Sequence, residues 1–377
     1  MTIESTLPSS WYLDDEIFAL EREYIFMCEW LCVGREEQLE GPGDHRVLDL
    51  YGESILLLRN SEGELRAFFN VCRHRGARLC VAQSEQQSDN LLPLRGGLIG
   101  GRSIMCPYHA WSYDLDGRLQ RMPHVTPEMG LDPEELSLHA VALECWGGFI
   151  FINLTPEAAQ PLLPQIASTI DLFQRYPMAE LRIGKSIHYE VEANWKVICE
   201  NYNECYHCGP VHPELCEVVP AFKQGGGAGL DWERGIPHRD GAVTFTASGT
   251  THRHMFPGLN EDEQVRHKGD LVYPNLFISA ASDHIAAFIL HARGAGHCSI
   301  DCHFLFEAAE VEKSDFDPSD AVDFWHTVNR QDWSICARVQ QGLSSRVHDS
   351  GIFSPMEDWN LDIRRYVSDR IGPYIPV

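Results

Sequence analysis

Residues 194–212 read NWKVICENYNECYHCGPVH, and the rest of the chain is organised around this stretch. No Pro or Gly interrupts residues 195–208, so the pattern predicts a helix over them. The dipeptide Gly209-Pro210 is expected to end that helix, because Pro removes a backbone donor and disfavours helical geometry just before it.

Acidic and imidazole side chains are spaced along this predicted helix. At 3.6 residues per turn, Glu200, Glu204 and His207 fall on one face. The turn after the helix can carry His212 back toward His207. Buried polar side chains need partners, so two imidazoles placed in this way favour a metal site over simple packing.

A third ligand is expected far downstream, within residues 321–341. Apolar side chains recur there at helical spacing and predict a core-facing stripe: Phe324, Trp325, Val328, Ile335 and Val339. Asp332 lies inside this stripe, where a carboxylate is costly unless a positive group binds it. His207, His212 and Asp332 together form the two-histidine, one-carboxylate set of non-haem Fe(II) oxygenases.

A second set of metal-binding side chains lies in two short motifs, Cys72-Arg73-His74 and Cys106-Pro107-Tyr108-His109. Zinc could use the two thiolates and two imidazoles as a structural site. Each motif mixes Cys with His, however, and this mixture is typical of a Rieske [2Fe–2S] cluster. Cys72 and Cys106 would then hold one iron, and His74 and His109 the other. Pro107 and Gly76 favour tight loops in which backbone N–H groups reach the sulfurs.

Composition excludes several classes of partner. The net charge of −25, from 30 Lys and Arg against 55 Asp and Glu, argues against a nucleic-acid or anionic-membrane surface. No apolar run approaches the roughly 20 residues that a membrane helix needs. The first residues lack a signal-peptide pattern, so we expect a cytoplasmic protein whose thirteen cysteines are reduced or bind metal.

The order of periodic patterns predicts an α+β fold with three segments. Residues 1–40 favour helical packing, residues 41–160 a small all-β domain, and residues 161–377 a catalytic domain with a bent antiparallel sheet around a long helix. Strands are expected at 46–50, 54–59, 65–71, 148–154, 185–191, 242–247, 271–280, 284–292 and 298–306. Two C-terminal helices are expected at about 320–344 and 357–371.

With both metal motifs in place, the chain resembles the catalytic (α) subunit of Rieske non-haem iron oxygenases over nearly its whole length. The resemblance rests on Cys72 to Gly76, Cys106 to Trp111 with Tyr113 and Gly117, Asn194 to His212, and Gln331-Asp332. It implies a Rieske domain followed by a helix-grip catalytic domain, a homotrimer, and electrons delivered from NAD(P)H by a separate flavin and iron–sulfur reductase. It further implies that the cluster of one subunit serves the iron of its neighbour through an acidic residue, here Glu204.

Two departures from the family pattern refine this interpretation. The gap between His74 and Cys106 is lengthened by an insertion around residues 84–101. The bridging position holds Glu204, where ring-hydroxylating members typically have Asp. This resembles the branch that acts on quaternary amines such as glycine betaine, choline, carnitine and stachydrine. The expected reaction is therefore hydroxylation or oxidative N-demethylation of a small quaternary amine with O₂.

Other interpretations stay open at the level of sequence. The chain could hydroxylate aromatic rings as a dioxygenase, carry electrons with the Rieske cluster alone, or bind zinc as an interaction module. Glu200 and Asn201 could support the iron site or serve only local structure. A quaternary amine calls for an aromatic cage, with candidates Tyr206, Trp232, Phe245 and Phe277. His252-Arg253-His254 is expected to be a loop, and residues 225–229 a mobile loop near the active site.

Overall fold

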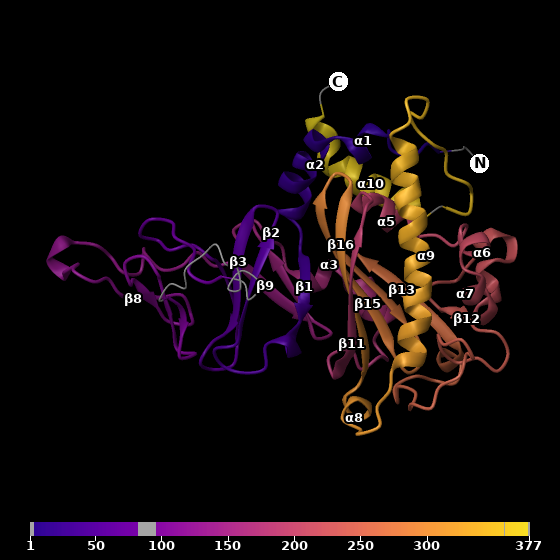
Figure 1. Ribbon diagram of the computed structural model, residues 1–377, viewed down its shortest axis with the longest axis horizontal. Coiled ribbons are helices and arrows are strands. Elements are labelled where there is room, and N and C mark those ends of the chain that lie inside the picture. Colours follow the sequence, from indigo (N-terminus) through magenta and orange to yellow (C-terminus); the bar gives the residue numbers. More distant parts are fainter. Residues whose placement is uncertain (1–3, 82–95, 358, 376–377) are drawn as a thin grey trace, which may run out of the picture. The chain divides into compact units, whose positions relative to one another are not determined.

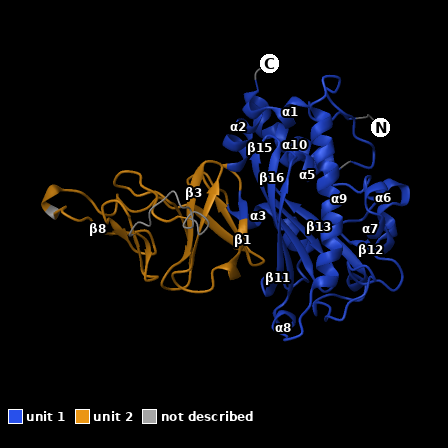
Figure 2. Cartoon of the chain, viewed as in Figure 1, with its two compact units in different colours: residues 1–26, 30–32, 161–377 blue, residues 27–29, 33–160 orange. Residues whose placement is uncertain are grey.

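The computed structural model describes residues 4–81, 96–357 and 359–375, and it divides into two units (Figure 2). Unit 1 comprises residues 1–26, 30–32 and 161–377, and unit 2 comprises residues 27–29 and 33–160. The domain limits expected from sequence, 40/41 and 160/161, remain predictions; the division by contacts assigns residues 33–40 to unit 2.

Helical structure at the start of the chain is shorter than predicted. It comprises α1 (Ser10–Leu13), α2 (Asp15–Glu21) and a π-helical turn, Arg22–Phe26. Asp14 caps α2 by accepting a 2.8 Å hydrogen bond from Glu16 N. The expectation of helix up to residue 40 is wrong, because Leu31–Arg35 form strand β1 in a sheet with β10, a pairing too distant in sequence to predict locally.

Unit 2 contains small sheets, as the alternating pattern predicted. Within the described residues their strand orders are β1-β10-β9, β2-β3-β4 and β5-β6-β7-β8. The bounds are β2 (His45–Leu50), β3 (Glu53–Arg59), β4 (Leu65–Phe69), β5 (Gly97–Ile99), β6 (Ser103–Met105), β7 (Ser112–Tyr113), β8 (Leu119–Arg121), β9 (Ala142–Trp146) and β10 (Phe149–Asn153). Residues 84–95, which make up most of the insertion predicted at 84–101, lie outside the described residues.

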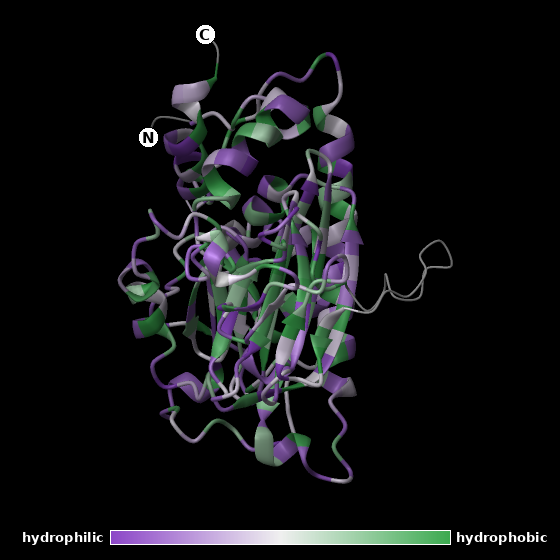
Figure 3. Ribbon diagram, turned by 90° about the vertical axis from the view of Figure 1, so that its left-hand side faces the viewer, coloured by the Kyte–Doolittle hydropathy of each residue, from purple (hydrophilic) through white to green (hydrophobic). Residues whose placement is uncertain are grey.

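Unit 1 is built on an antiparallel sheet of six strands within the described residues, in the order β11-β16-β15-β14-β13-β12. The bounds are β11 (Leu181–Val191), β12 (Ile236–Pro237), β13 (Arg266–Val272), β14 (Leu276–Ala280), β15 (Ile285–Gly294) and β16 (His297–Glu307). Colouring by hydropathy shows hydrophobic green along the central strands (Figure 3). This agrees with the complete burial of such residues as Ile278, Leu290 and Phe304.

Helices cover and extend this sheet. The α-helices of unit 1 after α2 are α3 (Leu162–Gln165), α4 (Ala167–Leu172), α5 (Trp195–Tyr202), α6 (Cys208–Val211), α7 (Pro213–Val218), α8 (Ala308–Val311), α9 (Ser319–Leu343) and α10 (Asn360–Ile371). Short 3-10 helices lie at Glu36–Gln38, Pro127–Met129, Pro220–Phe222, Gln224–Gly227, Glu263–Val265 and Gly372–Tyr374. No helix in the described part of the chain is long and apolar enough to cross a bilayer.

The 25-residue helix α9 packs against the sheet (Figure 1). Its buried stripe includes Phe324, Trp325 and Val328, as the helical spacing predicted. The Nε1 atom of Trp325 donates a 3.0 Å hydrogen bond to His284, just before β15. The Asn329 amide donates to the hydroxyl of Tyr189 on β11 at 3.3 Å. The expected α+β fold, with a sheet holding a long helix, is therefore confirmed.

Two of the strands predicted from the sequence differ from the structure. Residues 242–247 form no strand, because their backbone N–H groups bond locally, as in the 2.7 Å hydrogen bond from Val243 N to the Gly249 carbonyl. The single strand expected at 271–280 is two antiparallel strands, with Leu271 opposite Phe277. The turn between them contains Pro274, a signal that the apolar pattern on both sides obscured.

Candidate active site

His207, His212 and Asp332 converge in unit 1, with one potential ligand atom from each lying within 4.8 Å of the others. Nε2 of His212 is 2.8 Å from Oδ1 of Asp332, and Nε2 of His207 is 3.5 Å from the same oxygen. The two imidazole rings are 5.2 Å apart at an angle of 76°. Three donors from segments 120 residues apart therefore face one point.

The backbone route to His207 differs from the predicted helix. Helix α5 begins at Trp195, where Asn194 accepts a 2.9 Å hydrogen bond from Lys196 N, but it ends at Tyr202. The Glu204 carboxylate then accepts the backbone N–H of His207 at 3.1 Å, a bond that competes with continued helix. Gly209-Pro210 do not end a helix as predicted; they lie inside α6, where the first turn tolerates proline.

Each candidate imidazole ligand is held through its Nδ1 atom. Glu204 Oε1 lies 2.5 Å from Nδ1 of His207, and Gln331 Oε1 lies 2.8 Å from Nδ1 of His212. An acceptor at Nδ1 fixes the proton there and leaves the Nε2 lone pair free for a metal. Because both Nε2 atoms face Asp332, the donor set fits a divalent cation.

Electrostatics support the same conclusion. Burial opposes protonation of His207, but the carboxylates of Asp332 and Glu204 outweigh it and raise the pKa of His207 to about 11. Burial likewise opposes ionisation of Asp332, yet His207 and His212 lower its pKa below the ordinary value. Carboxylates that stabilise a protonated imidazole this strongly also stabilise a metal cation in place of the proton.

Glu200, which was expected to share a helix face with Glu204 and His207, has different surroundings from its neighbour Asn201. Glu200 accepts a 2.5 Å hydrogen bond from the Tyr12 hydroxyl. Burial raises the pKa of Glu200 to about 7. The Asn201 amide lies 3.3 Å from Nε2 of His207, beside the candidate metal position. Asn201 therefore borders the site, whereas the hydrogen bond between Glu200 and Tyr12 leads away from it to the N-terminal segment.

A cavity of about 320 Å³ opens beside the three candidate ligands. His207, His212, Asp332 and Glu204 all form part of its wall. Aromatic side chains make up much of the remainder: Tyr202, Phe222, Trp232, Phe245, Tyr273, Phe277, Phe288, Trp325, Trp333 and Trp359. Its size and apolar wall are those of a small-molecule site.

The structure supports three of the four aromatic candidates named from the sequence. Trp232, Phe245 and Phe277 line the cavity, but Tyr206 does not and is 47% exposed. Asp270, His267, Cys205 and Cys208 were missed as wall residues. Asp270 and His267 lie on strand β13, and nothing in the local pattern shows which face of that strand borders a cavity.

The Cys–His quartet of unit 2 forms a second centre. Cys72 and Cys106 are 2% exposed and within hydrogen-bonding contact of one another, while His74 and His109 are exposed, with their rings 4.7 Å apart. Backbone N–H groups of Tyr108 and His109 reach the Cys106 thiol, as the tight loops predicted. This division of buried sulfur and exposed imidazole donors fits a cluster with one iron on each pair.

Neighbouring residues shape the two loops of this centre. The Tyr113 hydroxyl lies 3.3 Å from the Cys72 sulfur and accepts the Arg73 N–H at 3.1 Å. Gly76, with φ of 73°, donates its N–H to the Cys72 carbonyl at 3.0 Å and closes a tight turn. At Gly117 a Cβ atom would lie 2.5 Å from the Phe68 ring, so only glycine fits.

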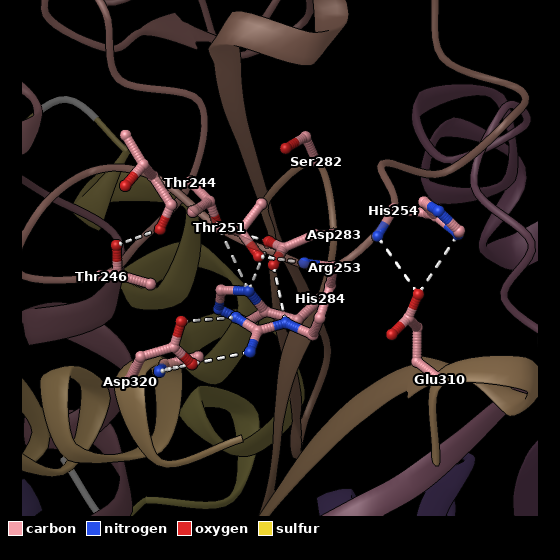
Figure 4. A network of polar contacts seen from close by, with 12 residues as sticks. Thr244, Thr246, Thr251, Arg253, His254, Ser282, Asp283, His284, Glu310 and Asp320 are labelled. Carbon is pink, nitrogen blue, oxygen red and sulfur yellow. Dashed lines mark hydrogen bonds and ion pairs between the residues drawn. The ribbon is translucent and has the colours of Figure 1, made fainter. Parts of the chain in front are cut away.

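The segment His252-Arg253-His254 is a loop, as expected. Arg253 Nε donates to Asp283 at 2.9 Å, and its terminal nitrogens bind Asp320 on α9 (Figure 4). His254 contacts Glu310 at 3.3 Å. Residues 224–227, which overlap the loop expected at 225–229, form a short 3-10 helix in which a Cβ atom at Gly226 would approach Tyr206.

The small β unit holds a Cys₂His₂ centre, and unit 1 holds a His₂Asp centre whose carboxylate lies on the long helix α9. Together the two centres define a Rieske-type non-haem iron oxygenase subunit. Comparisons agree. The family "Ring hydroxylating alpha subunit (catalytic domain)" matches residues 178–372, and the family "Rieske [2Fe-2S] domain" matches residues 29–145. The chain belongs to the ring-hydroxylating alpha subunit family, so the resemblance inferred from its motifs is confirmed.

Relatives and solved structures extend over most of the chain. The glycine betaine monooxygenase oxygenase subunit of Pseudomonas aeruginosa (strain UCBPP-PA14) is 28% identical over 94% of this chain and 86% of its own. The carnitine monooxygenase oxygenase subunit of Escherichia coli (strain K12) is 35% identical over 57% of this chain and 54% of its own. The quaternary ammonium Rieske monooxygenase CntA in complex with L-carnitine is 26% identical with a TM-score of 0.72, covering 98% of this chain and 96% of its own.

These findings establish the class of cofactor. The chain has a Rieske [2Fe–2S] domain and a His-His-Asp site consistent with mononuclear iron. The assignment of individual ligands remains a prediction.

Proposed function

We propose that this chain is the oxygenase component of a two-component monooxygenase that hydroxylates, or oxidatively N-demethylates, a small quaternary amine. The observation that carries this proposal is the cavity beside the His-His-Asp centre, whose wall combines aromatic faces with the carboxylates of Glu233, Asp270 and Asp362. Aromatic faces attract an organic cation, and carboxylates add to that attraction. The names of the relatives, glycine betaine and carnitine monooxygenase oxygenase subunits, support the same substrate class.

His207, His212 and Asp332 would hold Fe(II), which supplies the activation of dioxygen when bound. The chain itself prepares the ligands: Glu204 and Gln331 keep the protons of the two imidazoles on Nδ1. The apolar wall of the cavity limits the access of water to this position.

Cys72, Cys106, His74 and His109 would hold the Rieske cluster. We propose that a separate NAD(P)H-dependent reductase feeds this cluster in the cytoplasm, and that Glu204 relays charge between cluster and iron. We also propose that the protein assembles as a homotrimer. Sedimentation analysis of the purified protein tests the trimer, and a monomer at working concentration would exclude relay between subunits.

A substrate screen with a reductase of this class tests the reaction. Carnitine, glycine betaine, choline, stachydrine and benzoate are each scored for substrate-dependent oxygen uptake, with product identified by mass spectrometry. Uptake with one or more amines, together with formaldehyde or a hydroxylated product, supports the proposal. Uptake only with benzoate would reject it in favour of ring hydroxylation, which the aromatic wall could also accommodate.

Iron analysis separates the oxygenase from an electron carrier. An oxygenase of this class should hold about three irons per chain, two in the cluster and one on the His₂Asp set, whereas a carrier holds only the cluster. The ligand geometry of His207, His212 and Asp332 favours the oxygenase.

A further inference from the structure

The largely apolar wall of the cavity beside the His-His-Asp centre also carries several carboxylates among its described residues. Its wall includes Glu204, Glu233, Asp270, Asp332 and Asp362, but no Lys or Arg among the described wall residues. Glu204 and Asp332 belong to the candidate iron centre. Of the other three carboxylates, Asp362 pairs with Arg365 on α10 at 3.7 Å, whereas Glu233 and Asp270 form no ion pair with a basic side chain within the described residues.

Basic side chains on the elements that border the cavity are engaged elsewhere. Lys196 on α5 is fully buried in an ion pair with Glu21, on the N-terminal segment. Lys268 on β13 pairs with Glu263 at 3.1 Å and donates to the Leu172 carbonyl at 3.3 Å. Lys196 cannot turn to a substrate without leaving the buried carboxylate of Glu21 without its cation, and Lys268 would have to give up both of its contacts.

Three further basic residues near the cavity are not among its wall residues. Arg266 pairs with Asp262 at 3.0 Å and donates to the Gly235 carbonyl at 2.9 Å. Arg330 on α9 is exposed and lines a separate pocket together with Arg338. Lys223 is exposed and does not line the cavity.

The imidazole of His267 adds no positive charge to the wall. It is 5% exposed and packs edge-on against Phe245, with ring centroids 4.6 Å apart. Burial, reinforced by His238, lowers the pKa of His267 to about 3, so the ring is neutral near pH 7.

Asp270 is the carboxylate best prepared to meet a cation. Its Oδ2 accepts a 2.6 Å hydrogen bond from the Thr169 hydroxyl, and its Oδ1 accepts the Leu271 N–H at 3.0 Å. These bonds fix its orientation on β13 while leaving its charge unpaired by any cation in the described residues. An ammonium group nearby would stabilise the ionised form that burial opposes.

Building on the proposed function, we infer that this cavity selects an organic cation that carries no carboxylate, an amine with neutral arms such as an amino alcohol. A zwitterion would bring its carboxylate near Glu233 and Asp270, where the described wall residues include no Lys or Arg to pair with it, and the juxtaposition of like charges costs several kcal/mol. Asp270 is the specificity-determining residue, and it acts by direct attraction to the ammonium group.

A matched pair of ligands tests the inference. Choline and glycine betaine share the trimethylammonium group and differ in having a CH₂OH or a carboxylate at the other end. Binding is measured on the anaerobic holoenzyme by quenching of tryptophan fluorescence, since four tryptophans line the cavity: Trp232, Trp325, Trp333 and Trp359. Choline should bind at least about tenfold more tightly than glycine betaine. A second pair, γ-butyrobetaine and its methyl ester, should show the same preference for the ester.

A variant of Asp270 and a matched control test whether this residue causes the preference for choline. Asp270→Asn should weaken choline binding by about tenfold and narrow the gap between choline and glycine betaine. Asp171→Asn removes the same charge from an exposed position on α4, outside the cavity wall, and should leave both affinities unchanged. If Asp270→Asn does not fold, the two ligand pairs on the natural protein still decide the question.

The outcomes separate this inference from the function on which it rests. Equal or tighter binding of glycine betaine, with amine-dependent oxygen uptake, overturns the inference and leaves the amine monooxygenase standing. Oxygen uptake with benzoate alone, and no binding of either amine, overturns both. Preferential binding and turnover of the carboxylate-free member of each pair supports both.

Discussion

Nδ1 of His212 lies 2.8 Å from the amide oxygen of Gln331, the residue directly before Asp332. The amide nitrogen of Gln331 donates to Glu214 on α7 at 3.0 Å, and this bond fixes which end of the amide faces the ring. His212 must therefore carry its proton on Nδ1. One residue of α9 thus sets the tautomer of a ligand from a different segment, while its neighbour supplies the carboxylate.

The first prediction concerns this contact. Gln331→Leu should lower the affinity of the mononuclear site for Fe(II) by about 10- to 100-fold, because His212 loses the acceptor that orients its ring. The visible absorption of the Rieske cluster should not change. Iron titration of the metal-depleted protein, followed by activity and absorption, measures both effects. Gln341→Leu, an exposed position on the same helix, is the matched control; equal losses in the two variants would contradict a role in ligand orientation.

The two proposed centres should be separable by mutation. Asp332→Ala should abolish turnover while keeping the cluster absorption, because it removes the carboxylate 2.8 Å from His212 in unit 1. Cys106→Ser should remove the cluster absorption while leaving Fe(II) binding at the His₂Asp site. Visible spectra and iron analysis of both variants test this. Normal turnover by Asp332→Ala would exclude the ligand assignment.

A third prediction concerns stability at the start of α5. Lys196 and Glu21 form a fully buried ion pair, and Trp195 Nε1 donates to the same carboxylate at 2.7 Å. Lys196→Met should cost about 3–5 kcal/mol, because it leaves Glu21 charged and unpaired. The double variant Glu21→Gln, Lys196→Met leaves no buried charge and keeps an acceptor for Trp195, so it should be more stable than the single variant. Urea unfolding of the three proteins measures this; a double variant as unstable as Lys196→Met would contradict it.

A fourth prediction concerns the effect of acid on stability. Burial lowers the pKa of His238 to about 4 and that of His267 to about 3, against about 6.5 in an unfolded chain. Between pH 6.5 and these values the unfolded chain binds protons that the folded chain excludes. Stability should therefore fall as the pH falls through this window, by about 1.4 kcal/mol per pH unit for each histidine.

His238→Phe isolates one of these contributions. Neither ring nitrogen of His238 has a hydrogen-bond partner in the described part of the chain, and the ring packs against Phe245. The variant should lose less stability than the natural protein between pH 7 and pH 4.5, as measured by urea unfolding. His252→Asn, at an exposed loop position, should keep the natural slope. An unchanged slope in His238→Phe would show that the ring is protonated in the folded state.

Sequence reasoning found the candidate ligands because their chemistry is local. Asp332 was recognised as a carboxylate inside an apolar helical stripe, and Cys72 and His74 as a mixed pair on a tight loop. These signals depend on residues a few positions apart. The structure brings His207, His212 and Asp332 together as the pattern required, although the helix expected over 195–208 ends early.

Features set by distant contacts could not be predicted in this way. Helix α5 ends at Tyr202, whose hydroxyl donates to the Ile278 carbonyl on β14 at 2.7 Å, and no Pro or Gly signals that end. The cavity wall is likewise assembled from separate strands and helices. Asp270 can be recognised as a wall residue only once the face of β13 that it occupies is known.

Asp332 lies near the middle of a 25-residue helix, whereas His207 and His212 lie in a run of short turns and helices between Tyr202 and Val218. The long helix holds Asp332 in a fixed position. The histidine segment is therefore the part that can adjust when an ion enters or leaves. Chelation should accordingly speed amide hydrogen exchange in the histidine segment far more than in the centre of α9.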